Sequence, residues 1–442
     1  MKVRGPLIAT VVLAGLVGAL YWSNHHKPAE NAEAAATTSP TILSVQPADI
    51  SKVEVKDKGS EAVALARSGD TWQITAPQPL PADQDSVNSL LSSVHPLNSV
   101  ELVDEKAADL SQYGLANPTV EVDLTEKGNK TQQLLIGDET PTGTDLYAKL
   151  ENDPRVFTIA SYSKSSLDKG MDDLRDKRLI TADSAKISRL ELQAGQQNIV
   201  FGRNQDHAQW EIVKPRPLRT DNLQVDDLVR TLTDARMELT GGNDQKQNAS
   251  AFASATPVAT AKLSTGSGTE ELQVRKKKDD YYARSSVVSG VYKVSSDLGQ
   301  GLNKKLEDFR EKKLFDFGYN GPEKVEFRDG AKTSFLTKGG SDWWSGDGKK
   351  LQMAPAESFV DQLRDLSANK FADSGFAAPS IEITVTSDKG KRIEKVGIAK
   401  QGNQYLAKRA DGPSLYVLDK SSVEDLQKAA ADVKPEAPPK TQ

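Results

Sequence analysis

Cysteine is absent from the 442 residues of this chain. Its absence excludes disulfides, thiolate zinc sites, iron–sulfur clusters, thiol nucleophiles and lipoprotein-type anchoring through an N-terminal cysteine. Histidine is scarce, with four residues. His25 and His26 are adjacent but have no third or fourth ligand, and His95 and His207 lie far apart in the sequence, so we expect no metal site and no cofactor.

An excess of positive charge is also lacking. Lysine and arginine number 57 against 62 aspartate and glutamate residues, which leaves a net charge of −5 at pH 7. Because nucleic-acid-binding proteins present a basic surface, we expect no nucleic-acid partner. Hydrophobic residues make up 37% of the chain, enough for packed cores, and its length corresponds to about three domains.

One apolar run stands at the N-terminus. It covers residues 5–22 after Lys2 and Arg4, and as a helix it would be about 27 Å long, enough to cross a hydrocarbon core. Bulky residues at 20–22 stand where signal-peptide cleavage needs small ones, so we interpret residues 1–26 as an uncleaved membrane anchor. This interpretation predicts a single-pass protein of the inner (cytoplasmic) membrane, with its C-terminal bulk in the periplasm or extracytoplasmic space.

The sequence contains three tandem copies of one unit. Residues 72–80 (WQITAPQPL) return as 210–218 (WEIVKPRPL), and a less similar third copy starts at Trp344. Two apolar stripes of helical spacing follow in each copy, as one face of an amphipathic helix requires. The stripes are Val87, Leu90, Leu91 and Val94 with Leu167, Met171 and Leu174; Val225, Leu228, Val229 and Leu232 with Leu302, Leu306 and Phe309; and Phe359, Leu363 and Leu366 with Leu426, Ala430 and Val433.

Short apolar or alternating segments between these stripes predict strands, for example at residues 53–55, 63–65, 120–124 and 133–137. Hairpin-length loops between them favour antiparallel pairing. We therefore expect an α+β fold of three tandem repeats of antiparallel sheet with helices, after one N-terminal transmembrane helix. The expected domains are an anchor (1–26), a flexible tether (27–43), repeat 1 (44–180), repeat 2 (181–315), repeat 3 (316–434) and a disordered tail (435–442).

Four stretches of the first copy carry a family resemblance. They are residues 113–118 (YGLANP), 135–143 (LIGDETPTG), 147–149 (YAK) and 173–179 (DLRDKRL). Together they resemble the domain-of-unknown-function family numbered forty-three forty. The resemblance implies a bacterial, membrane-anchored extracytoplasmic protein, often encoded beside ABC-transporter components of the gliding-motility type. It implies no reaction and carries over no catalytic residue.

Two polar patterns admit a catalytic or metal-binding role but fit helix capping better. Residues 161–164 (SYSK) have the S-x-x-K form of penicillin-binding enzymes, yet the partner motifs are missing, so Ser161 or Ser163 is interpreted as an N-cap. Asp83 and Asp85 lack the remaining ligands of a calcium loop. We expect capping there, as at Asp221 in the second copy.

Three further features admit a ligand but fit a structural role better. Residues 138–142 are expected to form a turn after a strand, and the basic run at 275–278 to form a solvated hairpin tip. The tryptophans that open the copies, Trp72, Trp210 and Trp344, are expected to anchor the cores.

The charged stretch at residues 173–179 recurs as 308–314 (DFREKKL), whereas the third copy ends near residue 434. We interpret it as an inter-repeat hinge or ion-paired junction and not as a catalytic element.

We therefore expect no catalytic, cofactor-binding or metal-binding residues, and no enzyme. The leading hypothesis is a membrane-anchored extracytoplasmic binding or scaffold protein, accessory to an envelope complex such as an ABC transporter. One alternative is a carrier of a lipid or other envelope ligand, held between a sheet and its helices or between repeats. Another is an envelope hydrolase that uses paired carboxylates, since aspartate and glutamate are abundant.

Overall fold

The computed structural model describes residues 40–203, 209–239, 245–319 and 321–437. The chain divides into two compact units, with the boundary between Asp176 and Lys177. Both units are built on antiparallel sheets.

The first unit holds a nine-stranded sheet, here called the first sheet, and a small two-stranded one. Its strands are β1 (Thr41–Leu43), β2 (Ile50–Asp57), β3 (Val63–Ser68), β4 (Thr71–Ala76), β5 (Leu80–Pro81), β6 (Leu97–Asn98), β7 (Glu101–Asp104), β8 (Val120–Glu126), β9 (Thr131–Glu139), β10 (Asp145–Leu150) and β11 (Val156–Ala160). Its helices are α2 (Gln84–Ser93), α3 (Tyr162–Leu167) and α4 (Met171–Leu174). The first sheet has the order β5-β4-β3-β2-β8-β9-β10-β11-β7, and β1 pairs with β6.

The second unit holds a seven-stranded and an eight-stranded sheet, here called the second and third sheets. The second is formed by β12 (Arg189–Ala194), β13 (Gln197–Arg203), β14 (Trp210–Lys214), β15 (Thr256–Thr265), β16 (Gly268–Lys277), β17 (Asp280–Ser285) and β18 (Tyr292–Val294), with α5 (Asn222–Thr233), α6 (Gln245–Ser254) and α7 (Ser296–Leu302). The third is formed by β19 (Lys324–Asp329), β20 (Lys332–Gly339), β21 (Asp342–Ser345), β22 (Lys370–Ala372), β23 (Ile381–Ser387), β24 (Arg392–Gln401), β25 (Gln404–Arg409) and β26 (Leu415–Leu418), with α8 (Met353–Asp365) and α9 (Lys420–Asp432). Their orders are β14-β13-β12-β15-β16-β17-β18 and β21-β20-β19-β23-β24-β25-β26-β22.

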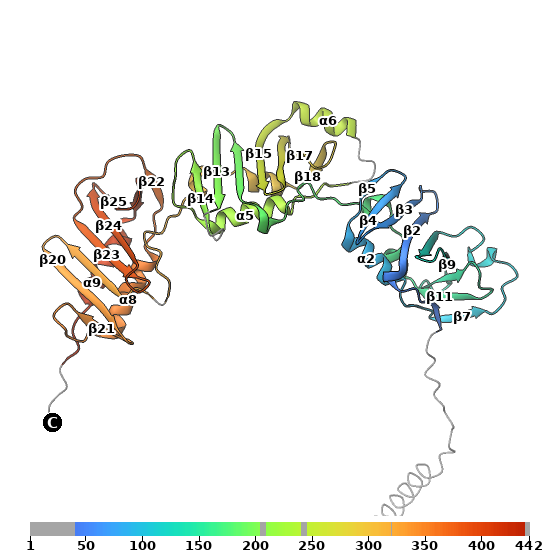
Figure 1. Ribbon diagram of the computed structural model, residues 1–442, viewed down its shortest axis with the longest axis horizontal. Coiled ribbons are helices and arrows are strands. Elements are labelled where there is room, and N and C mark those ends of the chain that lie inside the picture. Colours follow the sequence, from blue (N-terminus) through green and yellow to red (C-terminus); the bar gives the residue numbers. More distant parts are fainter. Residues whose placement is uncertain (1–39, 204–208, 240–244, 320, 438–442) are drawn as a thin grey trace, which may run out of the picture. The chain divides into compact units, whose positions relative to one another are not determined.

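The three large sheets share one topology. The strand that starts each sheet in sequence, β2, β12 or β19, pairs with a strand that lies beyond the first long helix in the sequence, β8, β15 or β23. The helices therefore cross over one face of the sheet, as α5 does on the second sheet and α8 and α9 do on the third (Figure 1). Each sheet has its own hydrophobic core, because its inward strand residues and its helix stripe are buried together.

The predicted stripe of the first helix in each copy is confirmed. The buried residues are Val87, Leu90 and Leu91 on α2; Val225, Leu228, Val229 and Leu232 on α5; and Phe359 and Leu363 on α8. The second stripe forms one helix only in the third sheet, where alanine-rich α9 is continuous. In the other two sheets it is divided, between α3 and α4 and between α7 and a 3-10 turn at Leu306–Phe309.

The expected fold class is wrong in the proportion of strand to helix and in its N-terminal transmembrane helix. The described chain consists mostly of antiparallel sheets, four in number, whereas the expectation was an α+β fold of three repeats of antiparallel sheet with helices, after one transmembrane helix. The reason is that each copy supplies seven or more strands but only short helices. Two expected boundaries also shift: Thr41–Leu43, placed in the tether, form β1, and Pro435, placed in the tail, pairs with Leu351. The other domain limits remain predictions.

The expected transmembrane helix and the inner-membrane, periplasmic location based on it are corrected by the structure. In the described part of the chain, no helix has the length and apolar character needed to cross a membrane. The longest described helices, α8 and α9, have 13 residues each, about 20 Å, and both are amphipathic. Residues 1–26, on which the prediction rested, lie outside the described residues.

The tryptophan anchors are confirmed in two copies and displaced in the third. Trp72 and Trp210 are each 2% exposed, within the first and second cores. In the third sheet the buried residue is Trp343, also 2% exposed, while Trp344 is 37% exposed. Adjacent residues of a strand point to opposite faces, so the one-residue error in alignment selected the solvent side.

Candidate functional site

The charged stretch that ends each copy returns to the start of the first helix. Its backbone forms isolated antiparallel bridges, Ala82 with Arg175 and Thr220 with Arg310. The third copy keeps this pairing, between Leu351 and Pro435. The interpretation of the whole stretch as an inter-repeat element is therefore wrong for its first part, which closes its own sheet.

The residues after this bridge dock onto the next sheet. Leu314 is fully buried in the third core, and its carbonyl oxygen accepts a hydrogen bond from Arg409 on β25. Two residues later the Asp316 backbone N–H donates to Glu394 on β24, at 3.1 Å. We call residues 311–317 the third-sheet connector. It joins the second sheet to the third through a leucine anchor and backbone hydrogen bonds.

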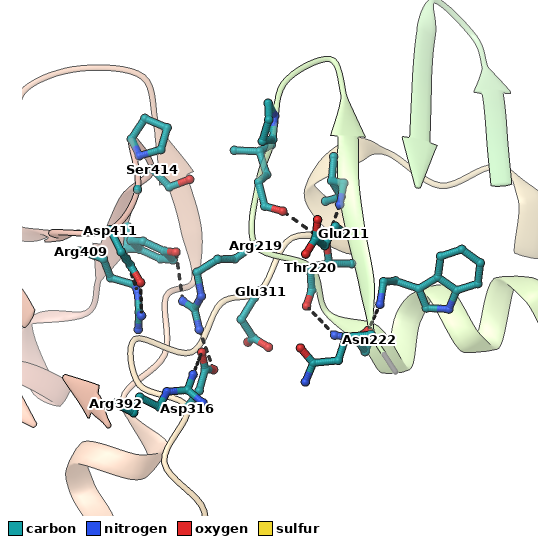
Figure 2. Close-up of a pocket in the computed structure, with 18 residues that line it drawn as sticks. Glu211, Arg219, Thr220, Asn222, Glu311, Asp316, Arg392, Arg409, Asp411 and Ser414 are labelled. Carbon is teal, nitrogen blue, oxygen red and sulfur yellow. Dashed lines mark hydrogen bonds and ion pairs between the residues drawn. The ribbon is translucent and has the colours of Figure 1, made fainter. Parts of the chain in front are cut away.

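An ion-pair network surrounds this connector (Figure 2). Arg219, from the turn after Pro217, reaches Asp316 at 2.6 Å, and Arg392 on β24 reaches the other Asp316 oxygen at 2.8 Å. Arg219 also donates to the carbonyl of Lys313 at 2.7 Å. One connector carboxylate therefore links an arginine of each sheet.

A second, more deeply buried pair supports the first. Arg409 and Glu394 are 3.0 Å apart, with side chains 4% and 2% exposed. Arg409 also donates to both oxygens of Asp411, at 2.9 and 2.6 Å. These hydrogen bonds lower the pKa of Asp411. Burial acts to lower the pKa of Arg409, but its bonds to Asp411 and Glu394 outweigh burial and raise it.

A cavity of about 520 Å³ lies beside the connector. Its lining includes Glu211, Arg219, Thr220, Asn222, Glu311, Asp316, Arg392, Arg409, Asp411 and Ser414, contributed by both sheets of the second unit (Figure 2). We call it the connector pocket. Burial raises the pKa of Glu311, against the opposing effect of the hydrogen bond that its carboxylate accepts from the Lys313 N–H at 2.8 Å. The pocket thus combines tightly paired charges with one carboxyl whose pKa is raised by burial.

The polar residues singled out from the sequence mostly have structural roles. Asp83 and Asp221 accept hydrogen bonds from the third backbone N–H beyond them and cap α2 and α5, as predicted. Ser161 precedes α3 but makes no capping hydrogen bond through its side chain. These residues do not lie together, and none of them lines the connector pocket.

The two loops considered as ligand sites are also structural. Thr140 and Gly143 close a turn after β9, as expected. Of the basic run, only Lys278 lies in the hairpin turn, because β16 extends to Lys277. Arg275 still belongs to β16 and lies over the Phe252 ring, with its guanidinium carbon 4.6 Å from the ring centroid.

The histidine predictions remain largely untested. His25, His26 and His207 lie outside the described residues. Among the residues that are described, no three His, Asp or Glu side chains are grouped to hold a metal ion.

The arginine that holds the connector does not match between the copies, so comparison of the matching positions does not reveal it. Within the repeated turn, Gln78 of the first copy becomes Arg216 in the second, and Pro81 becomes Arg219. Arginine at those two places is a departure from the repeat, and Arg219 holds the connector. Differences between otherwise matching copies were the available signal.

Comparison with known families identifies the family of the chain. Residues 72–209 and 210–380 each match the family described as "Domain of unknown function (DUF4340)". The two matches cover more than half of the chain, so the chain belongs to this family, and the resemblance carried by its motifs is confirmed. Each match begins at one of the buried tryptophans, Trp72 and Trp210.

Other comparisons add little. No curated protein matches the chain. Among solved structures, the crystal structure of the DNA polymerase sliding clamp from Pseudomonas aeruginosa with ligand aligns with 86% of this chain and 94% of its own, at 8% identity and a TM-score of 0.14. A likeness at that level supports no conclusion about fold or function.

Proposed function

We propose that this DUF4340 protein acts by binding, as a scaffold accessory to a larger complex such as an ABC transporter, and that a partner engages it at the connector pocket. The observation that carries the proposal is the pocket itself, which opens where a connector joins two sheets and is lined by both. A group bound there contacts two sheets at once. Such a site suits a scaffold, because binding energy couples directly to how the sheets are held.

The state of the pocket carboxylates favours binding over catalysis. Both oxygens of Asp411 are engaged by Arg409, and both oxygens of Asp316 by arginines. A carboxylate held this way is a poor nucleophile or base, because a reacting proton or carbon would have to displace an arginine. The expectation that the chain is not an enzyme stays a prediction, and an assay for hydrolysis with Glu311→Gln as the comparison would test it.

The cores favour a protein partner over an apolar ligand held between a sheet and its helices. The residues that line those interiors, such as Val87, Leu228 and Phe359, are fully buried by their neighbours. A lipid would have to displace packed side chains at a cost of several kcal/mol. The connector pocket, in contrast, is rimmed by charged groups.

In-cell photocrosslinking of the full-length chain tests the proposal. A photoreactive residue replaces Pro413, an exposed member of the pocket rim, and in a matched control replaces Lys332, an exposed residue of β20 that does not line the pocket. We expect a defined protein, identified by mass spectrometry, to be captured from position 413 and not from 332. Equal capture at both positions, or none at 413, would refute a partner site at the pocket, and a co-purifying lipid in its place would favour the carrier hypothesis.

A further inference from the structure

The arginine that closes the second sheet differs from those of the ion-pair network in one respect. Arg219, Arg392 and Arg409 each have a carboxylate oxygen within 3.0 Å. Arg310, 8% exposed, has none within ion-pair distance among the described residues. A buried guanidinium costs free energy unless its charge is compensated, so its isolation calls for an explanation.

The surroundings of Arg310 hold the guanidinium in one orientation. Its central carbon lies 3.4 Å from the centroid of the Phe371 ring on β22, and its Nη2 donates to the Ser414 hydroxyl at 3.0 Å. The ring of Tyr416 packs against Phe371, with centroids 5.4 Å apart. Stacking occupies a face of the guanidinium, but its N–H bonds lie in the plane of the group and point sideways. Among the described residues, no hydrogen bond is formed by the Nε or the Nη1 of Arg310.

The nearest carboxylates are committed elsewhere or remain too distant. Glu311 accepts from the Lys313 N–H, and Asp308 accepts from the Lys305 N–H at 2.7 Å. Glu307 and Asp373 act on Arg310 only through longer-range charge interactions. Burial is the main cause of the lowered pKa of Arg310, and the charge of Arg216 lowers it further.

A second arginine, Arg216, lies near enough for its charge to act on Arg310. Arg216 is exposed, stands in the Pro-x-Pro turn, and has no ion pair within the described ranges. Two like charges near one another are unfavourable unless an anion joins them. In the first copy the equivalent residue is Gln78, so this second arginine is specific to the turn of the second copy.

We propose that Arg310, Arg216 and the Ser414 hydroxyl form a binding site for an oxyanion, the carboxylate or phosphate group of a ligand that enters at the connector pocket. Nη2 has a second N–H, which lies parallel to a free N–H of Nε or of Nη1, so the guanidinium can bind such a group through paired hydrogen bonds. Ser414 belongs both to this site and to the pocket lining, which connects the two. The inference rests on the proposed function, since it names the chemical group that the partner presents there.

The test uses the purified full-length chain and two simple probes. Inorganic phosphate is titrated and followed by the broadening of its phosphorus NMR line, and acetate is followed by saturation-transfer proton NMR, both at constant ionic strength set with sodium chloride. We expect saturable binding of at least one probe, and the probe that binds more tightly distinguishes a phosphate from a carboxylate source. Arg310→Met is expected to weaken binding about tenfold or more, as loss of a paired charge-assisted hydrogen bond implies.

Two variants make the result specific. Arg364→Met is the matched control, because Arg364 also stacks on aromatic rings, Phe317 and Tyr319, but is already paired with Asp361. It should bind the probe like the parent chain. If Arg310→Met does not fold, as judged by circular dichroism, Arg216→Gln at the exposed position serves in its place and should weaken binding severalfold.

Three outcomes would overturn the inference: binding of neither probe, binding that does not saturate, or equal losses in the Arg310 (or Arg216) and Arg364 variants. None of them depends on a protein partner. A failure here together with specific crosslinking at position 413 would therefore remove the oxyanion site alone. Saturable binding without crosslinking would remove the protein partner and leave the site.

Discussion

Two connectors of the second unit make the same backbone contacts with different side chains. Where the chain enters the second sheet, the Leu179 carbonyl accepts from the Ser285 hydroxyl, and Glu270 accepts from the Thr181 N–H. Where it enters the third sheet, Arg409 and Glu394 occupy the corresponding places on the sheet. The two connectors therefore place the same backbone groups at equivalent positions of their sheets. The side chains that bind those groups differ, because an arginine in the third sheet stands where the second sheet has a serine.

The difference lies in solvent exposure as well as in residue type. The hydrogen bonds from Thr181 to Glu270 are exposed, so water can replace them. The Arg409–Glu394 pair is almost wholly buried. An exposed hydrogen bond adds about 1 kcal/mol or less, but removing one partner of a buried pair leaves an uncompensated charge. We therefore expect the third-sheet connector to be the less tolerant of substitution.

The largest effect is expected for Arg409→Met. The substitution leaves Glu394 buried without its cation, and the free energy of unfolding of the third sheet should fall by about 3–5 kcal/mol. Native-state hydrogen exchange of the amides in β24 and β25 measures that free energy within the intact chain. The double variant Arg409→Met with Glu394→Leu is the control and should recover part of the loss. If the single variant is as stable as the parent chain, the buried Arg409–Glu394 pair is not the reason that the two connectors differ in tolerance to substitution.

A smaller effect is expected at the other connector. Glu270→Ala removes the acceptor for the Thr181 and Ala182 N–H groups, which lie 2.8 and 3.1 Å from its carboxylate. Because water can reach these donors, the free energy of unfolding of the second sheet should fall by only about 1 kcal/mol. Hydrogen exchange of the β16 and β17 amides measures this change. A loss equal to that of Arg409→Met would contradict the comparison between the connectors.

The smallest effects concern pH and have opposite signs within one pocket. Glu311 has a raised pKa, so its ionised form opposes folding above that pKa, and the opposition disappears as the pH falls towards the ordinary glutamate value of about 4.3. Glu311→Gln should stabilise the second unit at pH 7 by about 0.5 kcal/mol or less, with the gain vanishing near pH 4.

Asp411 should behave in the opposite way. Its pKa is lowered by Arg409, so the stability that it contributes is present above the ordinary aspartate value of about 3.9 and is lost as the pH falls through the lowered pKa. Asp411→Asn should therefore destabilise at neutral pH and flatten the acid limb of the stability curve. The free energy of unfolding of both variants and of the parent chain is measured between pH 2 and 8. Parallel curves for the two variants would contradict the opposite pKa shifts of Glu311 and Asp411.

Local periodicity predicted the parts of the fold that depend on neighbouring residues. The stripes on α2, α5 and α8 are buried as expected, and the segments around Val53, Val63, Val120 and Leu134 form β2, β3, β8 and β9. A helix face or an alternating strand shows its buried side in the sequence, because the spacing itself determines which residues share a face.

The missed features depend on contacts between distant residues. The predicted second helix is split in two of the sheets, and Trp343 and not Trp344 enters the third core. The charged stretch that ends a copy pairs with the segment before the first helix of the same copy. The candidate site was missed altogether. Arg219 and Asp316 are 97 positions apart, and only folding brings them within 2.6 Å.

Local spacing and short motifs are enough to establish the repeats, the faces of the helices and strands, and the membership of the chain in its family. The folded chain was needed to show which sheet each connector enters, which charges are buried beside it, and that no carboxylate of the described residues lies within ion-pair distance of Arg310. The physical reason is that burial and ion pairing are set by the meeting of distant segments, and no single segment carries that information.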